Sequence, residues 1–235
     1  MESESQPNLP TRIRLDITRH GLHRTAYLLA IKLINKFLLF RILHGLYLRR
    51  VNPDYLTCPE GFDCGFLSEP QLRRYAQDPA NELDSDFLDE ALAKGDRCYA
   101  ILSAGNMAAY CWYSLQPTRI HPPELQIQFD TRYVYMYKGL TRPEFRGRRL
   151  YLIGMNRALN CYLRSGRKGL VCYVESHNFD SLKACLRLGY RIFGSIHVLQ
   201  LLGRYGIVGS PGCRRFGFRL QELPSGIEAL GVNKA

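Results

Sequence analysis

The sequence predicts an α+β domain in which helices flank a mixed, mostly antiparallel central sheet, with an extra amphipathic helix in front of it. Three observations lead to this class. Short apolar segments rich in β-branched and aromatic residues recur along the chain, helical patterns separate several of them, and a long apolar segment without acidic residues comes first. With 235 residues and 46% apolar content, the chain can bury one sizeable core.

The composition divides the chain into four parts. Residues 1–10 are acidic and serine-rich, and we expect a disordered tail there. Residues 11–53 are predicted to form an N-terminal amphipathic helical extension, residues 54–222 the α+β domain, and residues 223–235 a C-terminal tail.

Residues 25–50 indicate one long helix whose apolar circumference is interrupted by a cationic stripe. Lys32, Lys36 and Arg41 interrupt every window that is long enough for a membrane span, which argues against one. Two interpretations stay open. The helix lies on an anionic membrane surface, or it packs on the domain itself or on a second copy of the chain in a homodimer.

From residue 54 onward, short strands and helices are expected in a definite order. Two turn signals are clear, the hairpin turn Ala104-Gly105-Asn106 and the helix-ending Gly189. The expected elements are a strand at 62–67, helices at 69–77 and 85–94, strands at 97–103, 107–115, 125–129 and 132–140, a helix at 150–162, a strand at 169–175, a helix at 179–188, and strands at 191–202 and 213–220.

The most informative pattern runs from an aromatic strand through a basic turn into an apolar helix. A helix start presents unpaired backbone N–H groups and the positive end of the helix dipole, so it favours an anion. Here Arg142, Arg146, Arg148 and Arg149 add positive charge around Gly147. The sequence therefore predicts an anion-binding loop, with a solvated basic turn as the alternative.

A second pattern follows the first. Residues 169–175 indicate a buried strand, Ser176-His177-Asn178 comes next, and residues 179–188 form a short helix closed by Gly189. In this order the two patterns resemble the GNAT superfamily, the Gcn5-related N-acetyltransferases. Pro143 to Gly147 match the approach to that family's phosphate loop, and Glu175, Asn178, Ser181, Gly189 and Tyr190 match its second motif.

The resemblance spans roughly residues 60 to 220 and implies the GNAT fold, with two departures. Arg149 and Tyr151 occupy loop positions where the family has glycine or alanine, so the loop is atypical. Cys185 stands where many members carry a tyrosine that protonates the leaving thiolate.

The resemblance implies an acyl-CoA as donor, most simply acetyl-CoA, and an amine as acceptor. The loop would hold the pyrophosphate, and backbone groups of the preceding strand would face the pantetheine and polarise the thioester. Asn178 would contact the pantetheine arm, or it caps the helix. The implied donor-binding residues are Gly139, Leu140, Thr141, Arg146, Gly147, Arg148, Arg149, Leu150 and Asn178.

Acyl transfer also needs a base for the amine and a proton for the thiolate. Glu175, His177 and Glu144 are candidate bases, and each is also interpretable as an ordinary loop or surface residue. Tyr137 and Cys185 are candidate proton donors, and so are other tyrosines of the central strands. The alternative for these aromatic residues is ordinary packing against helices.

The predicted function is therefore an N-acyltransferase that moves an acetyl group from acetyl-CoA to an amine. Two alternatives are a membrane-associated enzyme similar to N-acyl amino acid synthases, which uses longer acyl chains, and a GNAT-like acyl-CoA-binding module without catalysis. The net charge of +11 suits a phosphorylated donor, an anionic membrane or nucleic acid, and the absence of a nucleic-acid-binding motif ranks the last lowest.

Eight cysteines could indicate a disulfide framework or a metal site, and we predict neither. Cys58 and Cys64 are six residues apart without a second close pair, and most of the others fall inside expected strands and helices, where cysteine behaves as a small apolar residue. The N-terminal residues do not resemble a secretory leader. We therefore expect a cytoplasmic protein, either free or peripheral at the inner face of the membrane.

Overall fold

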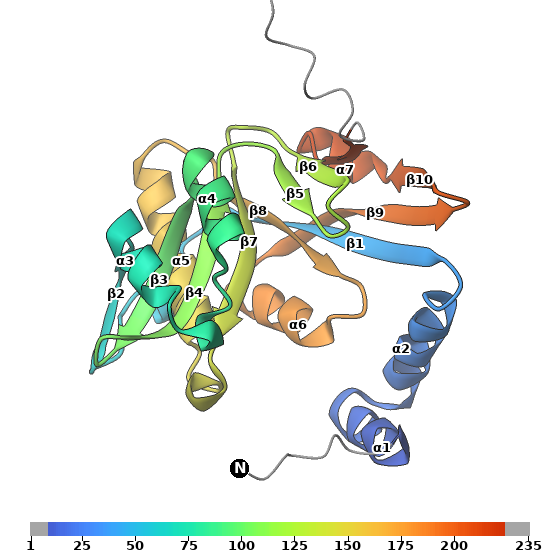
Figure 1. The fold of residues 1–235 in the computed structure, drawn as a ribbon, viewed down its shortest axis with the longest axis horizontal. Helices are drawn as coiled ribbons and strands as arrows, with labels where there is room; N and C mark the ends of the chain where they lie inside the picture. Colours follow the sequence, from blue (N-terminus) through green and yellow to red (C-terminus); the bar gives the residue numbers. More distant parts are fainter. Residues whose placement is uncertain (1–8, 224–235) are drawn as a thin grey trace, which may run out of the picture.

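The computed structural model describes residues 9–223, and its centre is an eight-stranded sheet (Figure 1). The strand order is β10-β9-β1-β8-β7-β4-β3-β2, and a second sheet has the order β11-β6-β5. The strands are β1 (Leu39–Leu48), β2 (Phe62–Phe66), β3 (Arg97–Ser103), β4 (Asn106–Ser114), β5 (Thr118–Ile120), β6 (Leu125–Gln128), β7 (Val134–Thr141), β8 (Leu170–Glu175), β9 (Arg191–Leu201), β10 (Arg204–Gly209) and β11 (Arg219–Glu222).

Helices cover both faces of the large sheet, and its paired strands are antiparallel except for β7 and β8, so the predicted α+β class is confirmed. The helices are α1 (Leu9–His20), α2 (Leu22–Ile34), α3 (Glu69–Tyr75), α4 (Ser85–Ala93), α5 (Leu150–Arg164), α6 (Phe179–Leu188) and α7 (Pro211–Arg215). The expected helix starts hold at α4, where the side chain of Asp84 accepts a hydrogen bond from the Phe87 N–H, and at α6, which Asn178 caps.

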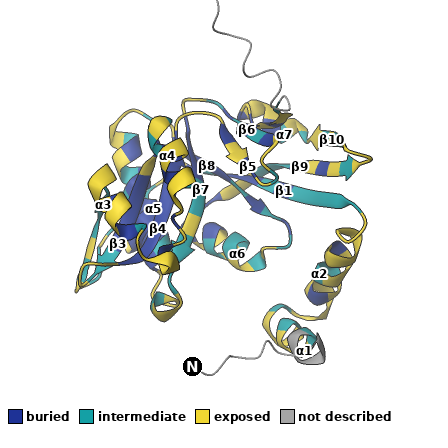
Figure 2. Cartoon of the chain, in the orientation of Figure 1, coloured by how far each residue is buried: buried dark blue, intermediate teal, exposed yellow. Residues whose placement is uncertain are grey.

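The core has three parts, one on one face of the sheet and two on the other. The apolar side of α5 packs with α6 against one face, where Leu159 and Cys172 are fully buried. On the opposite face, α3 and α4 cover Trp112 at one end, and the small sheet with α7 covers Leu43 at the other. Figure 2 shows the dark, buried strands enclosed between these layers.

The parallel contact between β7 and β8 is short. The two strands pair only through Val134 with Leu170 and Tyr135 with Val171, and then they diverge. The register of β7 against β4 also shifts, because Lys138 bulges out with φ +37° between Tyr137 and Gly139. The sheet therefore opens at the carboxyl ends of β7 and β8.

The prediction of one helical extension over residues 11–53 is wrong. Gly21, at φ +84°, separates α1 from α2, and α2 ends before Asn35, whose side-chain amide holds the backbone of Phe40. Residues 39–48 then form β1, which pairs with both β8 and β9. A strand buried on both faces is a continuous apolar run, which periodicity alone cannot distinguish from a buried helix.

The predicted disordered tail at the N-terminus was too long by two residues. Leu9 and Pro10, assigned to a disordered tail, begin α1. The rest of that tail, residues 1–8, and residues 224–235 of the predicted C-terminal tail lie outside the described residues. None of the helices between residues 9 and 223 combines the length and hydropathy that a bilayer span requires.

The two N-terminal helices contact the start of α6. The hydroxyl groups of Tyr27 and Ser176 are 2.6 Å apart, Arg19 pairs with Asp180 at 2.5 Å, and the rings of His20 and Phe179 lie 5.5 Å apart. This arrangement agrees with the interpretation in which the N-terminal helices pack on the domain itself.

The predicted strand at 213–220 is also wrong. Leu202 and Gly203, both with positive φ, form a tight turn between β9 and β10, and α7 follows. Gly212 allows α7 to approach β9 closely, since a Cβ there would lie 1.6 Å from the Phe193 carbonyl oxygen. The chain reaches the small sheet only at β11.

The structure contradicts the prediction of no disulfide. Cys58 and Cys64 are joined, because the chain turns back at Pro59 to Phe62 and brings their Cα atoms to 6.4 Å. The remaining cysteines are free, and all of them except Cys161 are buried as expected.

The central position of β1 predicts a large stability effect. Leu46 is fully buried, so Leu46→Ala should lower the free energy of unfolding by about 2–5 kcal/mol. Leu33→Ala on α2, where the side chain is 57% exposed, should change it by less than about 0.5 kcal/mol. Urea denaturation of both variants measures this, and equal effects would contradict the position of β1 in the core.

Candidate functional site

The opening between β7 and β8 contains a cavity of about 790 Å³. Tyr135 and Tyr137 line it from one face of the sheet, and Met136 and Cys185 line it from the other. The cavity is therefore lined by side chains from both faces of the sheet.

The basic loop and α6 line a second cavity, of about 320 Å³. Tyr151 lines both cavities. Arg146, Gly147 and Arg149 of the loop contribute to the second cavity, and Lys183 and Arg187 of α6 face them. The sequence analysis missed Lys183 and Arg187. Their spacing of four residues, which places them on one side of a helix, was the available signal.

The loop has the backbone conformation of an anion cradle. Gly147 and Arg149 have φ of +81° and +61°, so Arg149 adopts the left-handed conformation that glycine favours. The N–H groups of Gly147, Arg148 and Tyr151 find no backbone acceptor among residues 9–223. Leu150 can contribute only its backbone, because its side chain is buried in the core.

The arginines of the loop differ in whether a carboxylate already pairs with them. Arg142 pairs with Asp78 and Glu144, each at 2.9 Å, so both it and Glu144 have a structural role outside the large cavity. Arg146, Arg148 and Arg149 are exposed and have no carboxylate partner in the part of the chain that the structure describes. Three cations of the loop therefore remain for an anionic ligand.

The open edge of β7 continues from this loop. Gly139, Leu140 and Thr141 pair with β4 on one side, but β8 has already diverged on the other. The backbone groups that point toward β8 therefore face the opening. This edge can therefore form hydrogen bonds with an extended, polar ligand, and the cationic loop beside it suits an anionic group.

Tyr151 and Gly139 fit each other. A Cβ at Gly139 would lie 2.3 Å from the Tyr151 ring, so the glycine provides the room that the tyrosine fills. Burial raises the pKa of the Tyr151 phenol well above its ordinary value. Burial also raises the pKa of the neighbouring Cys111 thiol to about 12. Both groups therefore stay protonated at neutral pH.

Tyr137, a predicted proton donor, is engaged elsewhere. Its hydroxyl donates a hydrogen bond to Asp96, a fully buried carboxylate that also pairs with Lys94 at 3.0 Å. Burial, and then the charge of Asp96, raise the pKa of Tyr137. The Tyr137 hydroxyl therefore has a structural role, because it is engaged by the buried Asp96 carboxylate behind the cavity lining.

Glu175 and His177 meet at the mouth of the large cavity. One oxygen of Glu175 pairs with Arg41 of β1, and the other lies 3.3 Å from the His177 Nδ1. The His177 side chain is 42% exposed. The sequence analysis missed Arg41 as a partner because its segment was assigned to a helix.

Asn178 and Cys185 line the same cavity from α6. The Asn178 side chain accepts a hydrogen bond from the Ser181 N–H at 3.1 Å, which is the capping role. Cys185 is buried beside Cys172, whose thiol has a pKa raised by the neighbouring Cys185 thiol and by burial. These contacts give Cys185 the environment of a packed thiol.

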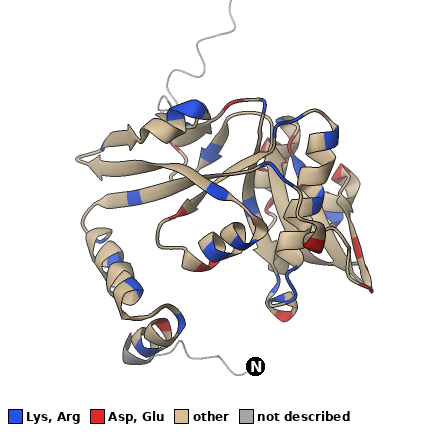
Figure 3. Cartoon of the chain, turned by 180° about the vertical axis from the view of Figure 1, so that it is seen from behind, with Lys and Arg blue, Asp and Glu red and all other residues tan. Residues whose placement is uncertain are grey.

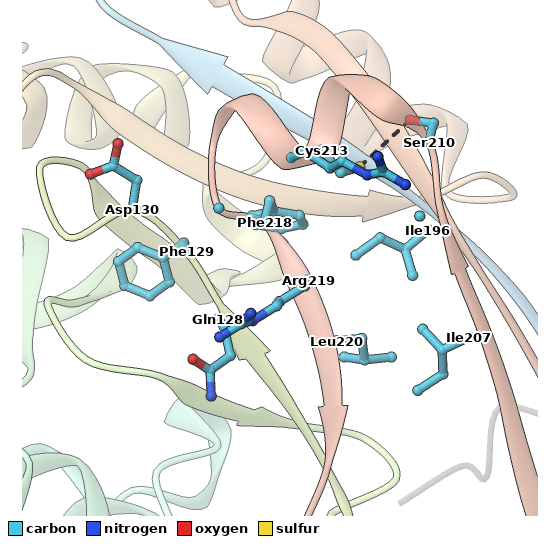
Figure 4. A pocket seen from close by; sticks show the side chains of 13 residues that line it. Gln128, Phe129, Asp130, Ile196, Ile207, Ser210, Cys213, Phe218, Arg219 and Leu220 are labelled. Atoms are coloured by element: carbon cyan, nitrogen blue, oxygen red, sulfur yellow. Dashed lines mark hydrogen bonds between the residues drawn. The ribbon is translucent and has the colours of Figure 1, made fainter.

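A third cavity, of about 620 Å³, lies between the small sheet and the β9–β10 hairpin (Figure 4). Its walls combine apolar side chains, such as Ile196 and Phe218, with polar and charged ones, such as Gln128, Asp130 and Arg219, and Ser210 is hydrogen-bonded to Cys213. None of the predicted site residues lines it. Within residues 9–223 no cluster of His, Cys, Asp and Glu side chains suits a metal ion.

Comparison with known proteins identifies the fold. No family model matches the sequence, and no curated protein matches it. A GCN5-related N-acetyltransferase from Sphaerobacter thermophilus superposes with a TM-score of 0.50 at 14% identity, covering 77% of this chain and 56% of that one. The chain therefore has the GNAT fold.

Two further solved structures are similar. A GCN5-related N-acetyltransferase-like protein from Streptococcus suis has a TM-score of 0.49 at 14% identity, and the match covers 73% of this chain and 66% of that one. A GNAT-family acetyltransferase from Colwellia psychrerythraea has a TM-score of 0.46 at 14% identity, with 68% and 56% covered. The chain thus spans less than two thirds of the length of these structures.

The left-handed conformation of Arg149 predicts that glycine is preferred there. Arg149→Gly should raise the free energy of unfolding by roughly 0.5–1 kcal/mol relative to Arg149→Ala, because alanine keeps the unfavourable φ. Chemical denaturation of the two variants measures the difference. A glycine variant that is less stable than the alanine variant would contradict the loop conformation.

Proposed function

We propose that this protein is an N-acyltransferase that moves an acyl group, most simply acetyl, from acyl-CoA to an amine. The cavity at the β7–β8 opening, which is lined from both faces of the sheet, is the observation that carries the proposal. In this proposal the donor enters beside the cationic loop on one face while the amine enters on the tyrosine-lined face. The GNAT fold of the chain agrees with this arrangement.

Donor binding rests on charge and backbone geometry. Four cations, Arg146 and Arg149 of the loop and Lys183 and Arg187 of α6, line one cavity, and its one acidic lining residue, Asp180, is paired with Arg19. The free N–H groups at the start of α5 add hydrogen-bond donors for the pyrophosphate. The open edge of β7 at Gly139 then provides hydrogen-bonding partners for the pantetheine arm and the thioester.

The transfer itself needs two proton movements. The amine nitrogen forms a bond to the thioester carbonyl carbon, the carbon–sulfur bond breaks, and the nitrogen loses a proton as the thiolate gains one. In this proposal His177, held by Glu175 beside the large cavity, accepts the amine proton. Tyr151, protonated and lining both cavities, supplies the proton for the thiolate, in place of the family tyrosine that Cys185 replaces.

A second candidate is transfer of a longer acyl group from acyl-CoA. The cavity of about 790 Å³ is larger than an acetyl group needs, and Tyr135, Tyr173 and Ile120 give it an apolar wall. Chain-length preference separates the two candidates. If octanoyl-CoA and palmitoyl-CoA are no better donors than acetyl-CoA, the second candidate fails.

The first experiment is calorimetric titration with acetyl-CoA, octanoyl-CoA and free CoA. Arg146→Ala with Arg187→Ala should weaken donor binding by at least about tenfold, because two charge-assisted contacts to phosphate are lost. The control Arg164→Ala, at the exposed C-terminal end of α5, should leave binding unchanged. Equal affinities in all three proteins would refute the loop assignment.

The second experiment separates catalysis from binding. Tyr151→Phe keeps the ring on Gly139 and removes only the hydroxyl, so the acyl-CoA Kd should stay unchanged while kcat falls by about 100-fold or more. His177→Ala should lower kcat by a similar factor, and His197→Ala, on exposed β9, should not. Acyl-CoA binding without turnover of any amine in the wild-type protein would instead support the binding-module alternative.

A further inference from the structure

One side of α2 exposes apolar residues instead of burying them. Thr25 and Ile31 are the buried positions of this helix. Leu29, Leu33 and, in the turn that follows, Phe37 continue the row of Thr25 toward the end of the helix and are 38%, 57% and 83% exposed. Their spacing of four residues places them in one row along the helix. Figure 2 shows the exposed positions along α2.

The turn between β9 and β10 exposes a second apolar group. Leu199, Leu201 and Leu202 are 39%, 56% and 94% exposed. In the pairing of β1 with β9, Leu39 lies opposite Gln200, so the end of α2 and this turn lie at the same end of the sheet (Figure 1). We call Leu29, Leu33, Phe37, Leu199, Leu201 and Leu202 together the apolar edge.

The two segments of the chain that carry the apolar edge contain no acidic residue. Residues 17–53 and 181–221 contain 14 of the 32 Lys and Arg residues and none of the 21 Asp and Glu residues. The remaining residues carry 18 basic and 21 acidic side chains, so the excess charge of the chain belongs to these two segments. Lys32 and Lys36 of the α2 region and Arg204 of β10 flank the edge, and Figure 3 shows no Asp or Glu on α2 or β10.

We propose that the apolar edge docks onto the anionic surface of a phospholipid bilayer. The leucine and phenylalanine side chains enter the interface, and Lys32, Lys36 and Arg204 contact the phosphate and carboxylate groups of the lipids. A second copy of the chain is a poorer partner. An isologous contact would place each cationic surface against itself without a single acidic residue from the two segments to compensate.

The proposal goes beyond the acyl-transfer function and places it at a membrane. Tyr27 of α2 contacts Ser176, which is the residue between Glu175 and His177. A bilayer bound through Leu29 and Leu33, on the other side of α2 from Tyr27, therefore lies about one helix diameter, roughly 10 Å, from this contact beside the large cavity.

Vesicle flotation of the full chain tests the proposal, using phosphatidylcholine vesicles with and without phosphatidylserine. The protein should float with the phosphatidylserine vesicles and release as salt is raised. Phe37→Ser with Leu201→Ser and Leu202→Ser should weaken binding by at least about tenfold. Leu115→Ser, which changes an exposed leucine after β4, should not.

A second test of the same surface reverses the charge of two lysines beside the apolar edge. Lys32→Glu with Lys36→Glu should weaken binding by at least about 25-fold, at roughly fivefold per charge removed. Arg164→Glu with Lys168→Glu produces the same net charge away from the edge and should weaken it far less. Equal loss in both pairs would mean that only the net charge matters and would overturn the assignment of the edge.

Two other results would also overturn the proposal. One is equal binding to vesicles with and without phosphatidylserine, or to neither. The other is a dimer in analytical ultracentrifugation that the Phe37, Leu201 and Leu202 variant abolishes, which would make a second copy the occupant. Acetyl-CoA titration of the same variants without vesicles should be unchanged, so failure here is distinguishable from failure of the acyl-transfer function.

Discussion

The short parallel contact of β7 with β8 is the constraint on which the rest of the site depends. Two residue pairs hold the strands together, and beyond Tyr135 the backbone of β7 has a partner on one side only. Unpaired backbone groups are costly when they are buried, so such an edge persists only where solvent or a ligand can satisfy it. The helices α5 and α6 cover the opening from one face, and with the basic loop before α5 they contribute to the lining of both cavities.

The sequence predicted most of the sheet from β2 to β9 because each strand there is bounded by a turn or helix signal. The hairpin at Gly105 and the capped start of α4 at Asp84 are examples. β1 was missed for a physical reason. It lies between two strands, is buried on both faces, and follows directly from a helix, so its apolar run lacks both alternation and a clear boundary.

The segments that line the cavities were predictable from the sequence, and the contacts of their individual side chains were not. The loop and the start of α6 do line the cavities, because backbone conformation there follows from local turn and cap residues. The roles of Tyr137 and Tyr151 depend on distant partners. Asp96 engages one phenol and Gly139 makes room for the other, and neither contact leaves a local signal. The atypical residues of the loop are thus partly compensated from β7.

The central place of β1 has a consequence for how the protein is made. Its neighbours β8 and β9 come late in the chain, so a strand synthesised early waits for Leu170 and the residues after it before it can pair. Such long-range closure slows folding and leaves an apolar, unpaired segment exposed during synthesis. We therefore expect the nascent chain to need protection against aggregation until its last third has left the ribosome.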